Sequence, residues 1–385
     1  MSSNVAFKHV TLKTTANLAL FAVATTICLW LCELGTRWLL GNQIMLIPRF
    51  HTSAQYGEFT IRRLRPNSEF WHTDPDGSWK FVTNSQGFRS NVDYEISKPW
   101  GVFRVIALGD STTEGFEVRQ NYTYPEVLQR YLRKNGFNAE VFNTGVSGFG
   151  TAEELIYLEN EGIKFNPDVV VLGFFGNDFD DNVRSDLFRM EDGELVTANR
   201  TYIPGVAILD VINSVPLLRW LSQNSYLYSL VANTVWDAAK RARLNANEQA
   251  RETEFTIATS PNKYKTDLTL ALLERLYAFC KLRSIPLVIV DIPQASEPQL
   301  TPSIPADLQS QFRKNSDALI LSEDLFSPYV GLAELHALHG VGHPNEFSNA
   351  MIALAVGERI RQLESGCAGG QQAGPCPAAR GGTPP

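Results

Sequence analysis

An apolar run that ends at a serine constrains the fold of this chain more than any other stretch. Residues 103–115 read FRVIALGDSTTEG, so a run typical of a buried strand stops at Gly109 and passes into a helix-like segment. Parallel strands of an α/β sheet end at the crevice where such folds bind ligands. A serine delivered there between two glycines is placed for nucleophilic attack. The stretch therefore predicts a parallel sheet, with Ser111 as candidate nucleophile for breaking or transferring an ester.

The chain beyond residue 101 repeats this alternation of strand and helix. Apolar strands are expected at 103–109, 139–145, 168–175, 286–292 and 317–321. Amphipathic helices are expected at 123–135, 151–163, 265–283 and 346–363. This pattern is typical of a parallel sheet with helices on both faces. We therefore predict one α/β domain over 101–365, a doubly wound parallel sheet sandwiched by helices.

Residues 184–260 interrupt the alternation. Asp192-Gly193 predicts a turn, and two apolar helical patterns follow at 206–222 and 225–243. We interpret the segment as a helical insertion that forms a lid over the active site. Extra packing and a surface that rests on a membrane stay open, because apolar spacing along a helix usually indicates core contacts.

The N-terminal part contains an apolar run long enough to span a membrane. Residues 16–40 carry only Glu33 and Arg37 as charged groups, and two lysines precede them. Basic residues on that side favour an inside N-terminus and an exported remainder. No small-residue cleavage site follows, so we favour a retained signal anchor over a cleaved signal peptide. This predicts a cytoplasmic tail at 1–15 and a single-pass membrane protein with its catalytic domain outside the cytoplasm, in the periplasm if the source is a Gram-negative bacterium.

Two flanking segments differ in composition from the α/β region. Residues 41–100 are rich in aromatics, glycine, proline and asparagine, and the turn signal at 74–77 predicts a hairpin. We interpret this region as a β-rich collar between membrane and catalytic domain, in which His72 has a structural role. Residues 366–385 are rich in glycine, proline, alanine and glutamine, and we expect them to be disordered.

Charge and cysteine content argue against two classes of partner. The formal net charge is −7 and no cluster of Lys and Arg is present, which argues against a nucleic-acid partner. No cysteine pair has the spacing of a zinc site with histidines alongside. We therefore expect neither a metal nor another cofactor.

Acyl transfer from an ester needs a nucleophile, a base and donors for the developing oxyanion. Gly145, after the second expected strand, can present its backbone N–H without a Cβ in the way. Asn177, after the third, offers a neutral amide donor. His343 lies just before the last helix and is a candidate base.

The blocks 109–115, 143–145, 176–178 and 343–345 resemble, in family order, the four blocks of the SGNH (GDSL-type) hydrolase superfamily. The resemblance covers roughly 101–363 and implies an SGNH, flavodoxin-like fold. It implies that Ser111 is the nucleophile and His343 the general base. The implied oxyanion hole comprises the N–H of Ser111, the N–H of Gly145 and the side chain of Asn177. No Gly-x-Ser-x-Gly elbow surrounds the serine, which argues against the α/β-hydrolase fold.

Two positions depart from the family pattern. Gly340 stands where the family usually has an aspartate that orients the histidine. A backbone carbonyl, or an acid from elsewhere in the chain such as Asp291 or Glu334, remains open as its replacement. Phe175 stands where the third block usually has glycine, which would reshape the pocket beside the asparagine.

Other polar residues near the blocks are interpreted as structural or secondary. Asp110 and Asp178 are expected to accept hydrogen bonds from turn N–H groups. His336 and His339 lie close to His343 in sequence, but only His343 precedes the Pro-Asn pair of the fourth block.

These observations predict a membrane-anchored serine esterase that forms an acyl-enzyme on Ser111. An O-acyltransferase acting on a cell-envelope or secreted polysaccharide is the alternative. A non-catalytic carbohydrate-binding protein that has kept the fold is the third hypothesis. The substrate is expected to be an acyl ester or an acylated carbohydrate.

Overall fold

The molecule is built around one parallel sheet. The structure is a computed structural model that describes residues 2–75, 77–252, 261–294, 300–338 and 342–368. Five parallel strands follow the order β12-β11-β7-β5-β6. They are β5 (Phe103–Gly109), β6 (Ala139–Asn143), β7 (Val169–Phe174), β11 (Leu287–Asp291) and β12 (Ala318–Ile320). This flavodoxin-like order confirms the predicted fold class and all five expected strands.

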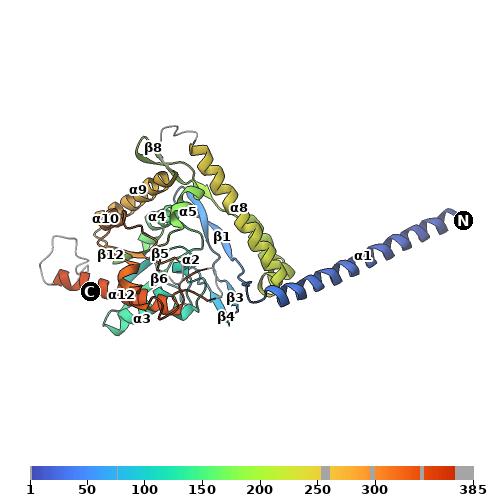
Figure 1. The fold of residues 1–385 in the computed structure, drawn as a ribbon, viewed down its shortest axis with the longest axis horizontal. Helices are drawn as coiled ribbons and strands as arrows, with labels where there is room; N and C mark the ends of the chain where they lie inside the picture. Colours follow the sequence, from blue (N-terminus) through green and yellow to red (C-terminus); the bar gives the residue numbers. More distant parts are fainter. Residues whose placement is uncertain (1, 76, 253–260, 295–299, 339–341, 369–385) are drawn as a thin grey trace.

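Helices cover both faces of the sheet (Figure 1). Successive residues of β5 point to opposite faces of the sheet, so Ile106 packs in one apolar cluster and Val105 in the other. The cluster with Ile106 includes residues of α4 (Thr151–Asn160) and α9 (Pro261–Leu282). The cluster with Val105 includes residues of α3 (Tyr124–Lys134) and α12 (Glu346–Ala368). Each of these four helices was expected from the sequence.

Helix α12 runs three residues into the segment expected to be disordered. It ends at Ala368, immediately before Gly369-Gly370, so the expectation for 366–368 is wrong. A single glycine at 366 does not stop the helix, whereas a pair of glycines follows its last residue. Residues 369–385 lie outside the described part of the chain.

Shorter elements connect these layers. They are α2 (Ser111–Glu114), α5 (Asp178–Ser185), α10 (Gln309–Lys314), α11 (Ser322–Phe326) and the 3₁₀ turns Gln120–Tyr122, Gly162–Phe165 and Ser327–Tyr329. The hairpin of β8 (Phe188–Glu191) and β9 (Glu194–Thr197) turns at Asp192-Gly193, as expected. Both turn residues have positive φ, which suits the tight turns that join antiparallel strands.

The insertion contains three helices where two were expected. They are α6 (Val206–Ser214), α7 (Pro216–Asn224) and α8 (Tyr226–Glu252). The predicted helix 206–222 is divided because Pro216 holds Val215 in an extended conformation and begins a new helix. The predicted helix 225–243 is correct in position but continues to Glu252.

Residues 41–100 contribute two antiparallel pairs. Strands β3 (Glu69–Asp74) and β4 (Gly77–Val82) form the expected hairpin. Strands β1 (His51–Tyr56) and β2 (Phe59–Leu64) form a second pair, and β10 (Thr201–Tyr202) from the insertion adds to β2 in parallel. Apolar residues of both pairs, such as Ile61 and Phe81, belong to the same core cluster as Ile106.

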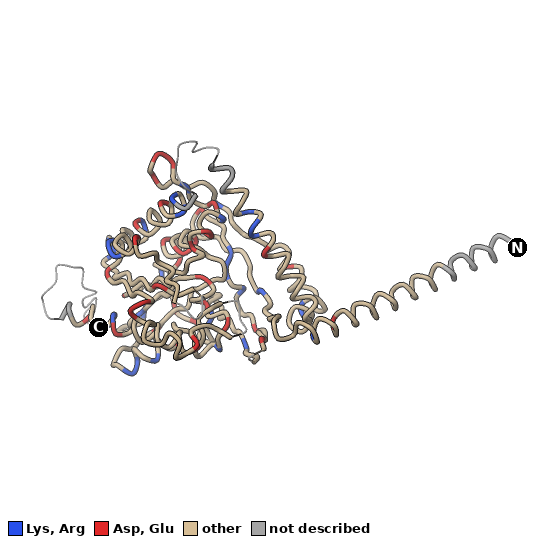
Figure 2. The backbone as a smooth tube through the Cα atoms, viewed as in Figure 1, with Lys and Arg blue, Asp and Glu red and all other residues tan. Residues whose placement is uncertain are grey.

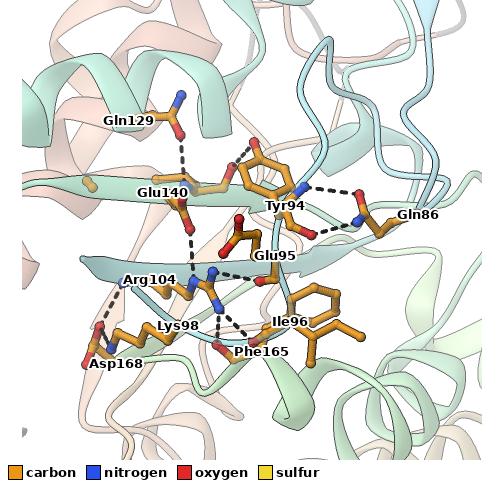
Figure 3. A network of polar contacts seen from close by, with 12 residues as sticks. Gln86, Tyr94, Glu95, Ile96, Lys98, Arg104, Gln129, Glu140, Phe165 and Asp168 are labelled. Atoms are coloured by element: carbon orange, nitrogen blue, oxygen red, sulfur yellow. Dashed lines mark hydrogen bonds and ion pairs between the residues drawn. The ribbon is translucent and has the colours of Figure 1, made fainter. Parts of the chain in front are cut away.

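A buried arginine ties the end of this region to the sheet (Figure 3). The Arg104 side chain on β5 is fully buried, and its Nε donates to Glu140 at 2.8 Å. The remaining acceptors are the carbonyl oxygens of Glu95, Ile96 and Phe165, at 2.7 to 3.0 Å. A buried cation is tolerated only when it is paired and hydrogen-bonded, and these acceptors meet that requirement.

One long helix leaves the body at the N-terminus. Helix α1 (Ser2–Leu40) projects away from the sheet, and Thr14–Leu40 is long and apolar enough to cross a membrane, with none of its apolar window buried. No Lys, Arg, Asp or Glu lies between Thr14 and Cys32, which Figure 2 shows as an uninterrupted uncharged stretch. Length and composition therefore fit a membrane anchor or a signal sequence.

Candidate active site

The candidate nucleophile lies at the N-terminus of a short helix directly after β5. Ser111 is the first residue of α2, and Asp110 caps that helix by accepting a hydrogen bond from the Thr112 N–H at 2.8 Å. Gly109 adopts φ +153°, and an added Cβ there would lie 2.0 Å from the Thr113 hydroxyl. Only glycine allows this close turn, which delivers Ser111 to the carboxyl edge of the sheet. The expectation that Asp110 caps the turn is confirmed.

A histidine from the far end of the chain faces the serine. The Nε2 atom of His343 lies 2.7 Å from the Ser111 Oγ, although 232 positions separate the two residues. The imidazole packs against Phe116, with ring centroids 5.4 Å apart. This geometry allows the hydroxyl to donate its hydrogen to the ring nitrogen.

The carboxylate beside the histidine is Glu117. Its Oε2 accepts a hydrogen bond from the His343 backbone N–H at 3.1 Å and lies 3.3 Å from Nδ1. The Nδ1 contact is an ion-pair distance without the alignment of a hydrogen bond. The Glu117 side chain is fully buried, so its charge acts on the imidazole with little screening by water.

Among the described residues the group beside Nδ1 is an acid from elsewhere in the chain, which was one of the open alternatives, but it is Glu117 and neither Asp291 nor Glu334. Asp291 accepts hydrogen bonds from the N–H groups of Ser303, Ile304 and Ser322, so its carboxylate holds neighbouring loops. Glu334 lines a cavity next to the site. Position 340 lies outside the described residues.

The loop that carries Glu117 is held by residues that precede the sheet. The buried guanidinium of Arg89 donates to the carbonyl oxygens of Glu114, Gly115 and Val118. The His72 Nδ1 lies 3.1 Å from the Phe116 carbonyl oxygen and donates to it. Burial lowers the pKa of His72 to about 3, so this ring stays neutral. His72 and Arg89 therefore hold in place the loop that carries Glu117.

Two residues assigned to the oxyanion hole lie at the site with their donors engaged. The Nδ2 of Asn177 donates to Asp110 and to Asp181, each at 3.0 Å. The Gly145 N–H donates to the Asn143 side chain at 3.2 Å. An added Cβ at Gly145 would lie 2.3 Å from the Glu114 nitrogen, so glycine is required at this approach to the nucleophile helix.

The expectation that Asp178 accepts hydrogen bonds from turn N–H groups is wrong. Both of its carboxyl oxygens are buried and have no hydrogen-bond partner among the described residues. Burial, together with the nearby charges of Glu154 and Asp110, raises the pKa of Asp178 well above its usual value. Burial without a cationic partner disfavours the ionised form of this carboxyl.

The other candidates do not meet the serine in the described structure. The His336 Nε2 lies 3.2 Å from the Pro293 carbonyl oxygen, and the ring is buried there. His339 lies outside the described residues. Phe175 is partly buried against the cluster that includes α12. Within the described ranges, no group of three or more His, Cys, Asp or Glu is arranged to hold a metal ion.

A cavity of 530 Å³ opens beside the acid. Its lining includes Glu117, Arg119 and Glu346 near the catalytic groups, and Asp74, Ser78 and Trp79 from the β3–β4 hairpin. The buried Trp79 indole N–H has no acceptor among the described residues. The carboxylates, the arginine and the asparagine among the lining residues offer hydrogen-bond partners to a ligand that carries hydroxyl groups.

The pH profile should report the influence of Glu117 on the histidine. Burial by itself lowers the pKa of His343, but the adjacent Glu117 carboxylate and the charges of Asp110 and Glu114 outweigh it and raise the pKa above 6.5. A general base must be neutral, so kcat/KM of ester hydrolysis should rise with pH along a limb centred above 6.5. A limb centred at or below that value would contradict this arrangement. The measurement is kcat/KM against pH in buffers of constant ionic strength.

A family model matches the part of the chain that carries three of the candidate site residues. Residues 107–255 match the model of the GDSL-like Lipase/Acylhydrolase family, a range that contains Ser111, Gly145 and Asn177. The chain carries a domain of this family. The GDSL-like family consists of hydrolases that act on esters, so the chain is an enzyme of that class. His343 lies beyond the matched range and joins the site through its contacts with Ser111 and Glu117.

Solved structures of GDSL-like and SGNH proteins are distantly similar. AlinE4, an SGNH-hydrolase family esterase, is 16% identical, covers 71% of this chain and 98% of its own, and has a TM-score of 0.30. The psychrotrophic esterase EstA from Pseudoalteromonas sp. is 12% identical, with coverages of 67% and 97% and a TM-score of 0.36. The lipase/acylhydrolase from Enterococcus faecalis is 14% identical, with coverages of 68% and 96% and a TM-score of 0.35. A search among curated proteins found no match.

Proposed function

We propose that the protein is a serine esterase that hydrolyses O-acyl esters through an acyl-enzyme on Ser111. One observation carries the proposal: the Ser111 hydroxyl lies 2.7 Å from the Nε2 of His343, whose other ring nitrogen faces the buried carboxylate of Glu117. Nucleophile, base and orienting acid in this order are the arrangement that activates a serine in many unrelated hydrolases.

In the first half of the reaction, the Ser111 Oγ attacks the ester carbonyl carbon while its proton moves to His343 Nε2. The imidazolium that forms is stabilised by the Glu117 carboxylate beside Nδ1. When the tetrahedral intermediate collapses, the bond to the alcohol oxygen breaks. That oxygen takes the proton from Nε2, the alcohol leaves, and the acyl group remains on Ser111.

In the second half, water attacks the acyl-enzyme and gives a proton to His343. The new tetrahedral intermediate then releases the carboxylic acid, and the proton returns to the Ser111 oxygen. The backbone N–H groups of Ser111 and Gly145 and the amide of Asn177 are the proposed donors for the oxyanion. One hydrogen of the Asn177 amide must exchange its carboxylate acceptor for the oxyanion, because both are engaged in the free protein.

The cavity beside the acid favours a second candidate, transfer of the acyl group to a carbohydrate. Carboxylates, an arginine and an asparagine line part of it, and these groups can hydrogen-bond the hydroxyl groups of a sugar acceptor. Chemically, a sugar hydroxyl would replace water in the second half of the reaction, and His343 would take its proton. The complete serine–histidine–glutamate set disfavours the third hypothesis, a non-catalytic carbohydrate-binding protein.

We further propose that α1 is a retained signal anchor and that the catalytic domain lies outside the cytoplasm. The uncharged stretch up to Cys32 and the lysines that precede it support this orientation. Helix α1 runs without a break from Ser2 to Leu40, and no small-residue cleavage site follows its apolar run in the sequence.

Covalent trapping tests the proposed function. The full-length protein in detergent is treated with a fluorophosphonate, which reacts with activated serines, and the adduct is located by mass spectrometry after proteolysis. We expect one adduct per chain, on Ser111, and parallel loss of activity toward a short-chain chromogenic ester. An adduct on another serine, or full activity after Ser111 is modified, would refute the assignment. Product analysis with and without an oligosaccharide acceptor then separates hydrolysis from transfer.

A further inference from the structure

Exposed apolar side chains gather on the helical insertion. Large residues of this kind within 203–235 are Ile203, Ile208, Val211, Val215, Leu217, Trp220, Val231 and Val235. We refer to these eight residues as the insertion face. Helices that face water normally carry polar residues on their outer side, and a concentration of exposed apolar groups marks an interaction site.

Helix α8 presents its apolar residues away from the body. On its inner side, Trp236 packs against Gly205, and Asn233 accepts a hydrogen bond from Arg49 at 2.9 Å. On its outer side, Val231 and Val235 are 55% and 63% exposed. Exposed alanines at 238 and 242 continue this stripe with helical spacing. The outer stripe therefore lacks the polarity that water would favour.

Helix α8 is fastened to the membrane-anchor candidate α1. The Glu33 carboxylate on α1 accepts hydrogen bonds from the Ser225 hydroxyl at 2.7 Å, the Tyr226 N–H at 3.1 Å and the Leu227 N–H at 3.0 Å. Arg37 donates to Glu33 at 2.6 Å, and its guanidinium stacks on the Tyr226 ring. A carboxylate that caps a helix N-terminus is well satisfied, so this joint fixes the position of α8 relative to α1.

We propose that the insertion face lies in the interfacial layer of the bilayer that α1 crosses. Figure 1 shows α1 leaving the body at the start of α8, while α8 runs back along the edge of the body that faces α1. The joint at Glu33 lies two helical turns before the end of α1, so the start of α8 lies near the depth at which α1 meets the membrane surface. The occupant is a lipid surface, reached without any further partner.

Residue types around the joint fit a lipid surface. Trp38 at the end of α1 is 85% exposed, and Trp220 on α7 is 57% exposed. Tryptophan is enriched at membrane interfaces, because its ring is apolar and its N–H is polar. Arg219 lies beside Trp220 in the sequence and supplies positive charge, which anionic headgroups attract, whereas the charge of Arg37 is balanced by Glu33.

If the insertion face lies in the bilayer interface, the cavity beside Glu117 lies close to the membrane surface. The backbone N–H of Trp71 on β3 donates to the Gln223 side-chain oxygen on α7 at 3.2 Å, and the Arg219 guanidinium donates to the Glu69 carbonyl oxygen at 3.3 Å. The same hairpin contributes Trp79 to the cavity lining. An acyl donor or acceptor held at the membrane surface would then reach the catalytic groups without leaving that surface.

Photolabelling from within the bilayer tests the proposal. The full-length protein is reconstituted in phosphatidylcholine nanodiscs that contain a lipid with a diazirine in its acyl chain, and labelled peptides are identified by mass spectrometry. We expect label on α1 and on peptides from 206–235, and none at Leu282, an exposed residue at the end of α9. Label confined to α1 would overturn the inference, as would equal label at Leu282. An unlabelled α1 would also refute the membrane anchor.

Glutamate substitutions on the insertion face, compared with one elsewhere, distinguish contact with lipid from contact with another partner. In the full chain, Trp220→Glu and Val235→Glu should each reduce label on α7 and α8 by about tenfold, because a carboxylate is costly among acyl chains. Label on α1 should persist, and Leu282→Glu should label like the unmodified chain. Hydrolysis of a soluble ester by all three variants provides the folding control and is independent of the membrane. Unchanged label in both Trp220→Glu and Val235→Glu, or cross-links between two copies through this face in place of lipid adducts, would refute the inference.

Discussion

Replacing Ser111 with alanine is expected to lower kcat for ester hydrolysis by on the order of 10⁴-fold or more, which is the scale seen when a nucleophile is removed from a serine hydrolase. The substitution deletes the oxygen that becomes acylated and leaves His343 without a proton donor at Nε2. Binding contacts and oxyanion donors remain, so a small residual rate is expected. The measurement is the initial rate of release from a short-chain chromogenic ester by purified full-length protein.

The serine prediction has a matched control. Ser310 is exposed and its hydroxyl contacts only the neighbouring Gln311 among the described residues. Ser310→Ala should therefore keep the activity of the unmodified chain. Thermal unfolding of both variants should occur near the temperature of the unmodified chain. If Ser111→Ala retains its activity while remaining folded, another residue is the nucleophile.

Replacing Glu117 with glutamine is expected to lower kcat by roughly 10² to 10⁴-fold, the range that follows from neutralising the acid of a serine triad. A neutral amide cannot stabilise the imidazolium formed during attack, and it can hold the ring in the wrong tautomer. The rise of kcat/KM with pH should also be centred at a lower pH, because the Glu117 carboxylate that raises the pKa of His343 is gone. KM should change much less than kcat, because Glu117 acts through the histidine.

Two further variants distinguish positioning from a loss of folding. Glu117→Asp keeps the charge on a shorter side chain and should recover part of the lost rate and of the pH shift. Glu334→Gln changes a second acid that lines the same cavity and should leave the pH limb in place. If Glu117→Gln leaves both kcat and the pH limb unchanged, the base is oriented by another group.

The sheet could be predicted from the sequence because its strands are continuous apolar runs buried on both faces. Strand β7, for example, is apolar or glycine throughout and buried at every position. Strand β1 has the sequence HTSAQY and shows no such signal, because it is held by pairing with β2 rather than by its own apolarity. Strand β10, on the other side of β2, pairs with β2 over only two residues, and no local sequence pattern predicts so short a strand.

The serine and the histidine could be predicted because each lies in a recognisable block, whereas the acid could not. Glu117 lies in a loop whose course depends on Arg89 and His72, two residues that precede the sheet. Contacts between such distant segments leave no periodic pattern in the sequence. The one local signal is an acidic residue between two apolar ones, Phe116 and Val118, shortly after the nucleophile. A charged residue between apolar ones is buried only when the folded protein supplies a partner that pairs with its charge.

The position of Glu117 also has a consequence for how such enzymes diverge. The acid that orients the histidine can come from the segment next to the serine. The residue three places before the histidine then need not be an acid. Glycine at 340 is then permitted where an acid would otherwise be required. Across relatives, an acid six positions after the serine and an acid three positions before the histidine should substitute for one another and seldom coexist. A lineage that gains the first can lose the second without losing its chemistry.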